Sequence, residues 1–290
     1  MCFSFDQINI DNRVRQSTEF KAIVKIIKSD ILKMLALAKS GHPGGAIGIS
    51  DLMAVLFFGN IMRYNSNDPN WEGRDRFILS AGHYAPVLYS CLARASFFPI
   101  EELTTLRKLG SRLQGHPANY GILPGIETTS GSLGQGISIA IGMAMNNKLI
   151  EKNDSKIFCL TGDGELQEGS CWEAAMSAGM YHLNNLCWIV DNNDCQIDGR
   201  VKDVMSIYPL AEKFSSFGFN VIEIDGHNYE EILSAFNQFL HTFDRPTCII
   251  AKTFMGNGIS FMHNKFTWHG NPPSMEQAKI ALAELDEIYN

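Results

Sequence analysis

Two short polar motifs place metal-binding residue types at corresponding positions in the chain. A Gly-Asp-Gly motif occupies residues 162–164 and an Asp-Asn-Asn motif occupies residues 191–193, and each follows an apolar segment of strand length. Twenty-seven residues lie between Gly164 and Asn192, which is enough for one crossover helix. Parallel strands joined by such a crossover end at the same edge of a sheet, so we expect the two motifs to lie together there.

Asp163 and Asn193 are the residues of these motifs that could hold a cation. Carboxylate and amide oxygens are hard ligands that suit Mg²⁺ or Ca²⁺, with backbone carbonyl, water and phosphate oxygens in the remaining positions. A diphosphate fits such a site. The chain carries 24 Lys+Arg against 31 Asp+Glu, a formal net charge of −7, so an anionic ligand needs a cation. Either motif alone favours an ordinary turn, since Gly, Asp and Asn are turn residues, but together they favour a metal and diphosphate site.

Four of the eight histidines, His42, His83, His116 and His269, lie in glycine-rich sequence. Imidazole titrates near neutral pH and can both donate and accept protons, as chemistry at a carbonyl group requires. A single Gly-His-Pro triplet could be a turn before a helix, but four histidines in glycine-rich sequence are less easily explained in this way. The other histidines lack this context and are predicted to be surface or packing residues: His182, His227, His241 and His263.

Two helices are predicted before the first strand. Residues 19–39 carry apolar side chains at a helical period, and Gly41 stands where that helix would stop. Residues 51–62 resemble a second helix, with Ser50 as its N-cap.

Beyond these helices, apolar runs of strand length alternate with helical patterns. The candidate strands are residues 76–80, 156–161, 186–191, 220–225 and 247–253. The candidate helices lie near residues 84–95, 136–151, 170–182, 209–217 and 229–243. This alternation predicts an α/β fold, with a mostly parallel central sheet and helices on both faces. In such sheets, ligands bind beyond the carboxyl ends of the strands.

Short linkers and an even composition favour one domain over residues 1–290, with residues 1–18 as a loosely ordered N-terminal extension. Residues 131–142 are rich in glycine and could cradle a phosphate, or the glycines could simply allow close helix packing. Both interpretations can hold, because this segment leads into an apolar helix whose methionines are predicted to be core residues.

Composition excludes several classes of protein. Hydrophobic residues make up 45% of the chain and charged residues 19%, which excludes a disordered or collagen-like chain. The acidic balance argues against nucleic-acid binding. No signal peptide is visible, and the longest apolar run, residues 52–58, is too short to cross a membrane. Seven scattered cysteines without a Cys-x-x-Cys pair favour reduced thiols in a cytoplasmic protein, although one of them could be reactive.

The two motifs and the sequence around them resemble those of a known protein family. A Gly-Asp-Gly motif followed after about thirty residues by Asn-Asn is the thiamin diphosphate signature, and the surrounding sequence resembles transketolases. The resemblance spans most of the chain, in ordered matches at residues 40–44, 80–83, 109–117, 129–136 and 268–270.

The resemblance implies roles for residues around the cofactor. Asp163 and Asn193 would bind the metal by their side chains and Cys195 by its backbone carbonyl. The metal is expected to be Mg²⁺, with Ca²⁺ or Mn²⁺ as alternatives. Further contacts with thiamin diphosphate are implied for Gly162 and Gly164 at the diphosphate, His83 and His269 beside it, Gly131 to Leu133 at the aminopyrimidine, and Ile197 at the thiazolium.

The resemblance also implies roles in catalysis and assembly. His42, His116 and His269 would line the channel for the sugar hydroxyls. Glu168 is expected at the catalytic and cofactor site, and Glu168 with Glu173 resembles carboxylates of a subunit interface that links two active sites. Two departures from the family pattern are Ala81, where Asn is frequent, and Glu165, where a smaller residue is frequent.

Transketolases need a glutamate that faces the cofactor's pyrimidine, and in the family it comes from a second domain. This chain ends at Asn290, where the first domain would end. We therefore expect the N-terminal subunit of a split transketolase, active only with a C-terminal subunit in an α2β2 heterotetramer. It would transfer a two-carbon ketol unit from a ketose or ketose phosphate to an aldehyde. The alternatives are another thiamin diphosphate carboligase, of the acyloin or deoxyxylulose phosphate type, and a non-catalytic partner subunit.

Overall fold

The structure is a computed structural model that describes residues 3–10, 14 and 16–289. The predicted N-terminal extension, residues 1–18, therefore lies partly outside the described residues. Within it, Phe5 is buried, and the amide of Ile10 donates to the carbonyl of Arg94 (2.8 Å). Helix α1 (Ser17–Ala38) begins at the end of this segment.

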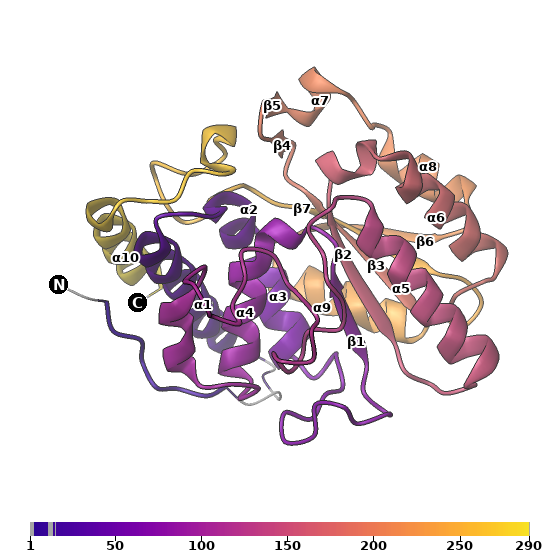
Figure 1. Ribbon diagram of the computed structural model, residues 1–290. Helices are drawn as coiled ribbons and strands as arrows, with labels where there is room; N and C mark the ends of the chain where they lie inside the picture. The colour runs from indigo at the N-terminus through magenta and orange to yellow at the C-terminus, as the bar shows by residue number, and fades with distance from the viewer. Residues whose placement is uncertain (1–2, 11–13, 15, 290) are drawn as a thin grey trace.

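A parallel sheet of five strands forms the centre of the molecule (Figure 1). It consists of β1 (Arg76–Leu79), β2 (Ile157–Gly162), β3 (Leu186–Asn192), β6 (Asn220–Asp225) and β7 (Thr247–Lys252). Their order across the sheet is β1-β2-β3-β7-β6, and every pair is parallel. A separate antiparallel pair joins β4 (Cys195–Gln196) to β5 (Gly199–Arg200). The predicted mostly parallel sheet is confirmed, and each strand begins and ends within one residue of its expected position.

Helices cover the two faces of the sheet. The remaining α-helices are α2 (Pro43–Gly48), α3 (Ser50–Phe58), α4 (Ala85–Arg94), α5 (Gln135–Met145), α6 (Gly169–Met180), α7 (Val201–Val204), α8 (Leu210–Ser216), α9 (Tyr229–Leu240) and α10 (Met275–Tyr289). Short 3₁₀ turns occupy Gly82–Tyr84, Ile100–Thr105, Gly164–Gln167 and Phe266–Trp268, and a π-helical turn, Asn146–Ile150, continues α5. Helices α1, α3, α4 and α9 contribute to one hydrophobic core, and α5, α6 and α8 to the other.

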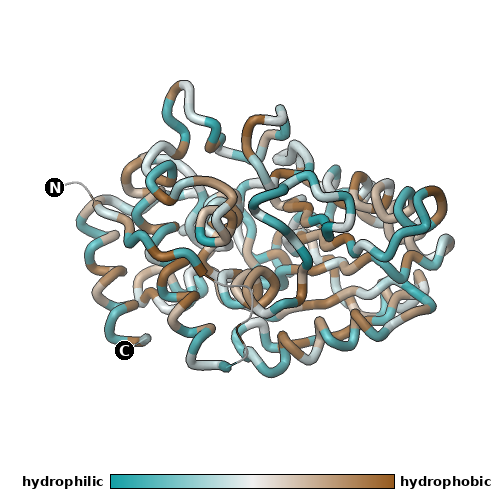
Figure 2. The backbone as a smooth tube through the Cα atoms, turned by 90° about the horizontal axis from the view of Figure 1, so that it is seen from below, coloured by the Kyte–Doolittle hydropathy of each residue, from teal (hydrophilic) through white to brown (hydrophobic). Residues whose placement is uncertain are grey.

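Alternation along the strands explains these two cores. In β2, Phe158 and Leu160 belong to the core under α9, whereas Ile157 and Cys159 belong to the core under α5 and α6. Several helices in turn show hydrophobic and hydrophilic positions alternating along their length (Figure 2), as expected when one side faces the sheet, whereas α2, α3 and α4 are buried all round. Because all five strands run in one direction, their carboxyl ends share one edge of the sheet.

The second predicted helix differs from the observed one. Ser50 is not an N-cap, because α2 and α3 follow each other almost directly and the Ser50 hydroxyl donates to the carbonyl of Ala46 (2.9 Å). Helix α3 ends at Phe58 rather than at residue 62, and the amide of Gly59 donates to the carbonyl of Val55 (2.8 Å).

The end of α1 also differs from the prediction. The helix stops at Ala38, and Lys39, not Gly41, takes the left-handed conformation (φ 52°) that ends it. Gly41 has φ +125°, and a Cβ there would lie 2.4 Å from the Leu35 side chain. Glycine is therefore required at position 41 by its backbone conformation and by close packing, and not because it ends the helix.

The described cysteines are all buried and unpaired: Cys91, Cys159, Cys171, Cys187, Cys195 and Cys248. Cys2 lies outside the described residues. Within the described part of the chain, no helix combines the length and the apolar character needed to span a membrane.

Candidate functional site

Asp163 is the first residue after β2 and is almost completely buried (1% exposed). Its carboxylate accepts hydrogen bonds from the amides of Gly164 (2.8 Å) and Asp194 (2.6 Å). Burial, and then the neighbouring Asp191 carboxylate, raise the pKa of Asp163 well above its ordinary value. A cation beside this group would remove that penalty, so the geometry suits a bound metal ion.

Asn193 follows β3 and has a fixed amide orientation. Its Nδ2 donates to the Asp191 carboxylate (2.7 Å) and to the Tyr84 hydroxyl (3.2 Å), while its Oδ1 accepts from the amide of Cys195 (2.8 Å). A carbonyl oxygen has two lone pairs, so one remains for a ligand. Asp194, which lies between Asn193 and Cys195, donates a hydrogen bond from its backbone amide to the Asp163 carboxylate. The loops after β2 and β3 therefore meet, as predicted.

Asp191 was not singled out by sequence reasoning, although it begins the Asp-Asn-Asn motif. It is fully buried and accepts hydrogen bonds from Tyr84 (2.8 Å), Asn193 and the Thr253 hydroxyl. Burial raises its pKa above the ordinary value, and these three donors act in the opposite direction. Asp191 orients Asn193, whereas Tyr84 and Thr253 lie in no motif that would have revealed them.

Within the described part of the chain, no group of three or more His, Cys, Asp or Glu side chains is arranged to hold a metal ion. A cation at this edge would therefore depend on Asp163 and Asn193 together with backbone and ligand oxygens. Such a mixed oxygen set is what Mg²⁺ commonly uses when it binds phosphates.

A cavity of about 200 Å³ opens beside these residues at the carboxyl edge of the sheet. Nine residues predicted for the site line it: His83, Leu133, Gly162, Asp163, Gly164, Glu168, Cys195, Ile197 and His269. Asn193 instead lines an adjoining cavity of about 440 Å³, together with Arg200 and Lys252. His42, His116 and Gly131 do not line the smaller cavity, but they lie close to it through the histidine cluster.

The four histidines in glycine-rich sequence lie together in the structure. The ring centroid of His42 lies 5.3 Å from that of His83, 6.1 Å from that of His116 and 5.7 Å from that of His269. Three of their buried nitrogens, His42 Nδ1, His83 Nε2 and His269 Nδ1, have no hydrogen-bond partner among the described residues. Buried polar atoms normally have partners, so these nitrogens fit a polar ligand such as a cofactor or a sugar.

Burial lowers the pKa of each of these four histidines. The pKa of His42 falls to about 4, chiefly because its ring is removed from water and then because His269, Arg107 and His116 lie nearby. At neutral pH the cluster therefore consists of uncharged imidazoles, which can accept a proton at one nitrogen and donate one at the other.

Glycines after β1 and around the start of α5 allow backbones to approach each other closely. A Cβ on Gly82 would lie 2.7 Å from the amide nitrogen of Gly131, and one on Gly136 would lie 2.6 Å from the Cα of Ser80. Gly131 has φ +136° and packs against the His116 ring. Close packing thus accounts for Gly136, while Gly131 belongs to the loop beside the histidines.

Glu165 is a buried residue (2% exposed) that the sequence marked only as a departure from the family pattern. Its carboxylate accepts from the amides of Gly134 (2.8 Å) and Gly162 (3.2 Å) and from the Ser80 hydroxyl. Burial raises the pKa of Glu165 to about 7. One side chain therefore joins the ends of β1 and β2 to the loop that precedes α5.

The other predicted positions are more exposed. Glu168 and Glu173 lie at the start of α6 with exposed side chains, and Leu133 and Ile197 are 37% and 62% exposed. Three of the four histidines predicted to be surface or packing residues are exposed: His182, His241 and His263. His227 is different, because its side chain is only 15% exposed and belongs to a polar network.

A parallel sheet with buried carboxylates and histidines at its carboxyl edge defines an α/β domain suited to a charged cofactor. Residues 19–285 match the family described as "Transketolase, thiamine diphosphate binding domain", and the chain belongs to this family. The resemblance to transketolases is thereby confirmed.

Two kinds of relative are similar to the chain. The transketolase of Homo sapiens is 44% identical over 250 residues, which cover 86% of this chain and 39% of that protein. The 6-deoxy-6-sulfo-D-fructose transketolase subunit SqwG of Clostridium sp. (strain MSTE9) is 38% identical over 272 residues, which cover 94% of this chain and 98% of that one. A Phocaeicola vulgatus protein named as one of the subunits of apulose-4-phosphate transketolase is 38% identical over 257 residues, covering 89% and 90%.

Solved structures agree with this assignment. The transketolase from Leishmania mexicana superposes with a TM-score of 0.86 at 32% identity, covering 94% of this chain and 42% of that one. The chain thus spans about two fifths of the length of the animal transketolases and of this structure, but almost the full length of the proteins named as subunits.

Proposed function

We propose that this chain is the N-terminal, diphosphate-binding subunit of a two-chain transketolase. With a C-terminal subunit that carries the pyrimidine-facing glutamate, it would transfer a two-carbon ketol unit from a ketose or ketose phosphate to an aldehyde. The main support is that the proteins named as transketolase subunits align with this chain over 98% and 90% of their own lengths. A cytoplasmic location is part of the same proposal and is supported by six buried, unpaired cysteines.

The proposal assigns the cation, preferably Mg²⁺, to Asp163, Asn193 and the backbone carbonyl of Cys195. Two features support this assignment: the buried Asp163 carboxylate beside Asp191, and the fixed orientation of the Asn193 amide. Thiamin diphosphate, when bound, supplies the nucleophilic carbon for cleaving and forming the carbon–carbon bond.

The cofactor itself would lie along the 200 Å³ cavity. Gly162 and Gly164 would approach the diphosphate, while His83 and His269 would donate hydrogen bonds to it. The unpaired nitrogens His83 Nε2 and His269 Nδ1 support this role. The backbone from Gly131 to Leu133 would contact the aminopyrimidine, and Ile197 would contact the thiazolium.

Protein residues beside the cofactor would handle the sugar. His42, His116 and His269 would exchange protons and hydrogen bonds with its hydroxyls, for which neutral imidazoles are suited. Their proximity to one another and the lowered pKa of each support this role.

The partner chain would cover acidic residues at the start of α6 and apolar residues further along it. Glu168 precedes α6 and lines the cavity, Glu173 lies in the first half of the helix, and Met176 and Met180, which are 60% and 74% exposed, lie toward its far end. Exposed apolar side chains on one face of a helix are typical of a protein interface. We propose an α2β2 heterotetramer in which Glu168 and Glu173 lie between the subunits.

The test is to mix this chain with a C-terminal transketolase subunit, thiamin diphosphate and Mg²⁺ and to assay phosphorylated, sulfonated and unmodified ketose donors with aldehyde acceptors. We expect ketol transfer from at least one ketose only when both chains are present. Activity with pyruvate but with no ketose would contradict the proposal in favour of a decarboxylating carboligase. The absence of any cofactor-dependent reaction would favour a non-catalytic subunit.

A further inference from the structure

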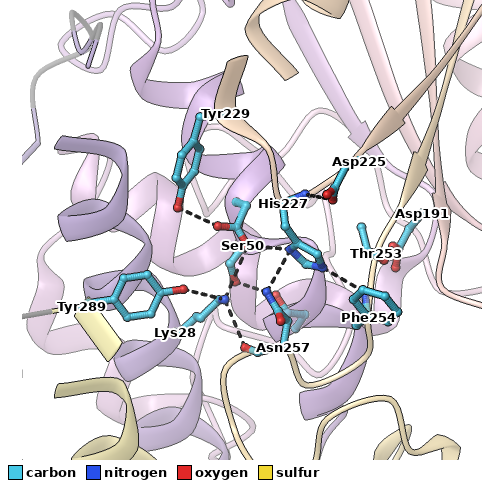
Figure 3. A network of polar contacts seen from close by, with 12 residues as sticks. Lys28, Ser50, Asp191, Asp225, His227, Tyr229, Thr253, Phe254, Asn257 and Tyr289 are labelled. Carbon is cyan, nitrogen blue, oxygen red and sulfur yellow. Dashed lines mark hydrogen bonds and ion pairs between the residues drawn. The ribbon is translucent and has the colours of Figure 1, made fainter. Parts of the chain in front are cut away.

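A buried polar network joins helices α1, α3, α9 and α10 and the segment after β7 (Figure 3). Its central residues, Lys28, Asp51 and His227, do not line the candidate cofactor cavity. Its centre is Lys28 of α1, which is fully buried. The Lys28 ammonium donates to the Tyr289 hydroxyl of α10 (3.0 Å) and the Asn257 carbonyl (3.1 Å), and it pairs with Asp51 of α3 (3.5 Å). A network of this kind could be purely structural, so its contacts toward the site decide its role.

Asp51 is the charged acceptor of the network. It receives hydrogen bonds from the Tyr229 hydroxyl (2.7 Å) and from His227 Nδ1 (3.0 Å). Burial on its own would raise the pKa of Asp51, but Lys28 and His227 hold it below the ordinary value. Asp51 is therefore an ionised carboxylate that accepts from the imidazole.

The hydrogen bonds of His227 determine which of its nitrogens carries the proton. The backbone amide of Phe254 donates to His227 Nε2 (3.0 Å), and a backbone amide can only donate. Nε2 is therefore unprotonated, and Nδ1 carries the proton that is donated to Asp51. The Asn257 side-chain amide also lies 3.0 Å from Nδ1, and beside a protonated Nδ1 only its oxygen, not its Nδ2, can face the ring as an acceptor. The imidazole thus links the charged carboxylate to the backbone of the segment that follows β7, and the Phe254 ring stacks on it at 5.8 Å.

That segment, residues 253–256, reaches the candidate metal site at its first residue. The Thr253 hydroxyl donates to the Asp191 carboxylate, and the Thr253 amide donates to the carbonyl of Asn192 (3.3 Å). Asp191 in turn fixes the amide of Asn193. The position of Thr253 therefore sets the orientation of a proposed metal ligand.

The same segment supports the histidine cluster at its other end. The amide of Gly256 donates to the carbonyl of Gly44 in α2 (2.9 Å), and a Cβ on Gly48 would lie 2.9 Å from the carbonyl of Phe254. Helix α2 directly follows His42. A shift of residues 253–256 would thus move both the metal side and the histidine side of the site.

We propose that His227 is a positioning residue for the cofactor site, acting through the hydrogen bond from the Phe254 amide to Nε2. This bond holds residues 253–256 in place, and they hold Asp191 and α2. The inference rests on the proposed function for the roles of Asn193 and His42. The position of the segment itself can be tested without cofactor.

Two substitutions test the two hydrogen bonds of the imidazole separately. In His227→Gln the side-chain oxygen reaches the position of Nε2 and can accept from Phe254, but the link to Asp51 is lost. In His227→Asn the amide reaches the position of Nδ1 and can donate to Asp51, but the Phe254 amide loses its acceptor. Tyr229→Phe is the matched control, because it removes another donor to Asp51 and leaves residues 253–256 untouched.

The first measurement is hydrogen–deuterium exchange of the Phe254 amide in the full chain without cofactor. We expect exchange about tenfold faster in His227→Asn, the effect of one lost hydrogen bond, and near wild type in His227→Gln and Tyr229→Phe. Equal exchange in all three variants would overturn the proposal. If His227→Asn does not fold, Thr253→Val is used instead, because it removes the hydrogen bond from the Thr253 hydroxyl to Asp191. We expect this variant to show the weaker Mg²⁺ binding described below. Unchanged Mg²⁺ binding in Thr253→Val would overturn the proposal.

The second measurement is the apparent Kd for Mg²⁺ in the complex of this chain with thiamin diphosphate and the C-terminal subunit. We expect it to rise about tenfold in His227→Asn and to change less than twofold in His227→Gln and Tyr229→Phe. A purely structural role would lower the melting temperature of all three variants without separating their Mg²⁺ affinities, which would overturn the proposal. If even the wild-type complex binds no cofactor, the proposed function fails and the metal part of this inference fails with it, whereas the exchange experiment still decides the role of His227 in the fold.

Discussion

Asp163 and Asp191 are both buried at the carboxyl edge of the sheet, 1% and 0% exposed, and the presence of Asp191 helps to raise the pKa of Asp163. Two carboxylates buried close to each other do not stabilise a fold by themselves. Their arrangement with Asn193 is accounted for if the site exists to hold a cation. The unpaired nitrogens of the histidine cluster lead to the same conclusion, because burying them has a cost that a ligand would offset.

Asp163→Asn tests the cation site. We expect the apparent affinity for Mg²⁺ and thiamin diphosphate in the two-chain complex to fall at least about tenfold, because one charged ligand is lost. The melting temperature of the chain without cofactor should change by less than about 4 °C, since an unfavourably buried charge is also removed. Titration calorimetry and thermal melting measure the two effects, with the exposed Asp203→Asn as control. Unchanged affinity would contradict the assignment.

The histidine cluster predicts how stability depends on pH. The unfolded chain binds a proton at each histidine below about pH 6.5, whereas folded His42 does so only near its lowered pKa of about 4. The unfolded state then binds more protons, so stability falls as pH decreases through this window, by at most about 1.4 kcal/mol per pH unit for each histidine. Urea unfolding at pH 7, 6 and 5 should show a smaller decrease in His42→Gln than in wild type. His182→Gln, at an exposed position, should behave as wild type, and equal slopes in all three proteins would contradict this account.

At the scale of elements, the candidate site lies where side-chain hydrogen bonds connect the carboxyl ends of the strands. Glu165 joins the ends of β1 and β2 to the loop before α5, and Asp191 joins β3 to the segment after β7. These contacts are hydrogen bonds from side chains to loops whose sequences show no helical or strand pattern. They keep the carboxyl edge in one arrangement before any ligand binds.

Glu165→Ala is expected to destabilise the chain by roughly 2–4 kcal/mol, because it leaves the Gly134 and Gly162 amides and the Ser80 hydroxyl buried without an acceptor. Urea unfolding measures this change. Glu168→Gln, three residues further along at an exposed position, should change stability by less than about 0.5 kcal/mol. Equal stability of Glu165→Ala and wild type would show that the carboxylate does not hold the loops together.

The strands were predictable because each is a short apolar run between polar segments, and β2 and β3 lead directly into recognisable motifs. Helix α3 was misjudged because all nine of its residues are buried, so it has no polar face to mark its ends. The polar network of His227 could not be predicted for another reason. Its partner Asp51 lies 176 positions away in the sequence, and no local pattern reveals such a contact.

At the scale of the whole molecule, an acidic domain presents a cavity at one edge of the sheet and exposed apolar residues both at the cavity wall and along α6. Met176 and Met180 lie on the outer side of α6, and Leu133 and Ile197 lie at the cavity wall. Buried in an assembly, Leu133 and Ile197 would help to exclude water from the site, and Met176 and Met180 would lie in the interface along α6. We therefore regard the isolated domain as part of an active site.

Met180→Glu is expected to weaken assembly, because it places a charge in the proposed interface. Light scattering after size exclusion should show a smaller species for the variant than for wild type when both are mixed with the C-terminal subunit. Thermal melting of the isolated chain should be unchanged, since Met180 is 74% exposed. Phe243→Glu, at an exposed position before β7, is the control. Assembly of Met180→Glu at the wild-type mass would place the interface elsewhere.

The central claim is that this chain holds half of a thiamin diphosphate site. Calorimetric titration of thiamin diphosphate with Mg²⁺ into each chain alone and into their mixture tests it most directly. We expect saturable, Mg²⁺-dependent binding by the mixture, none of comparable affinity by either chain alone, and loss of binding with Asp163→Asn. Tight binding by this chain alone, or none by the mixture, would contradict the claim.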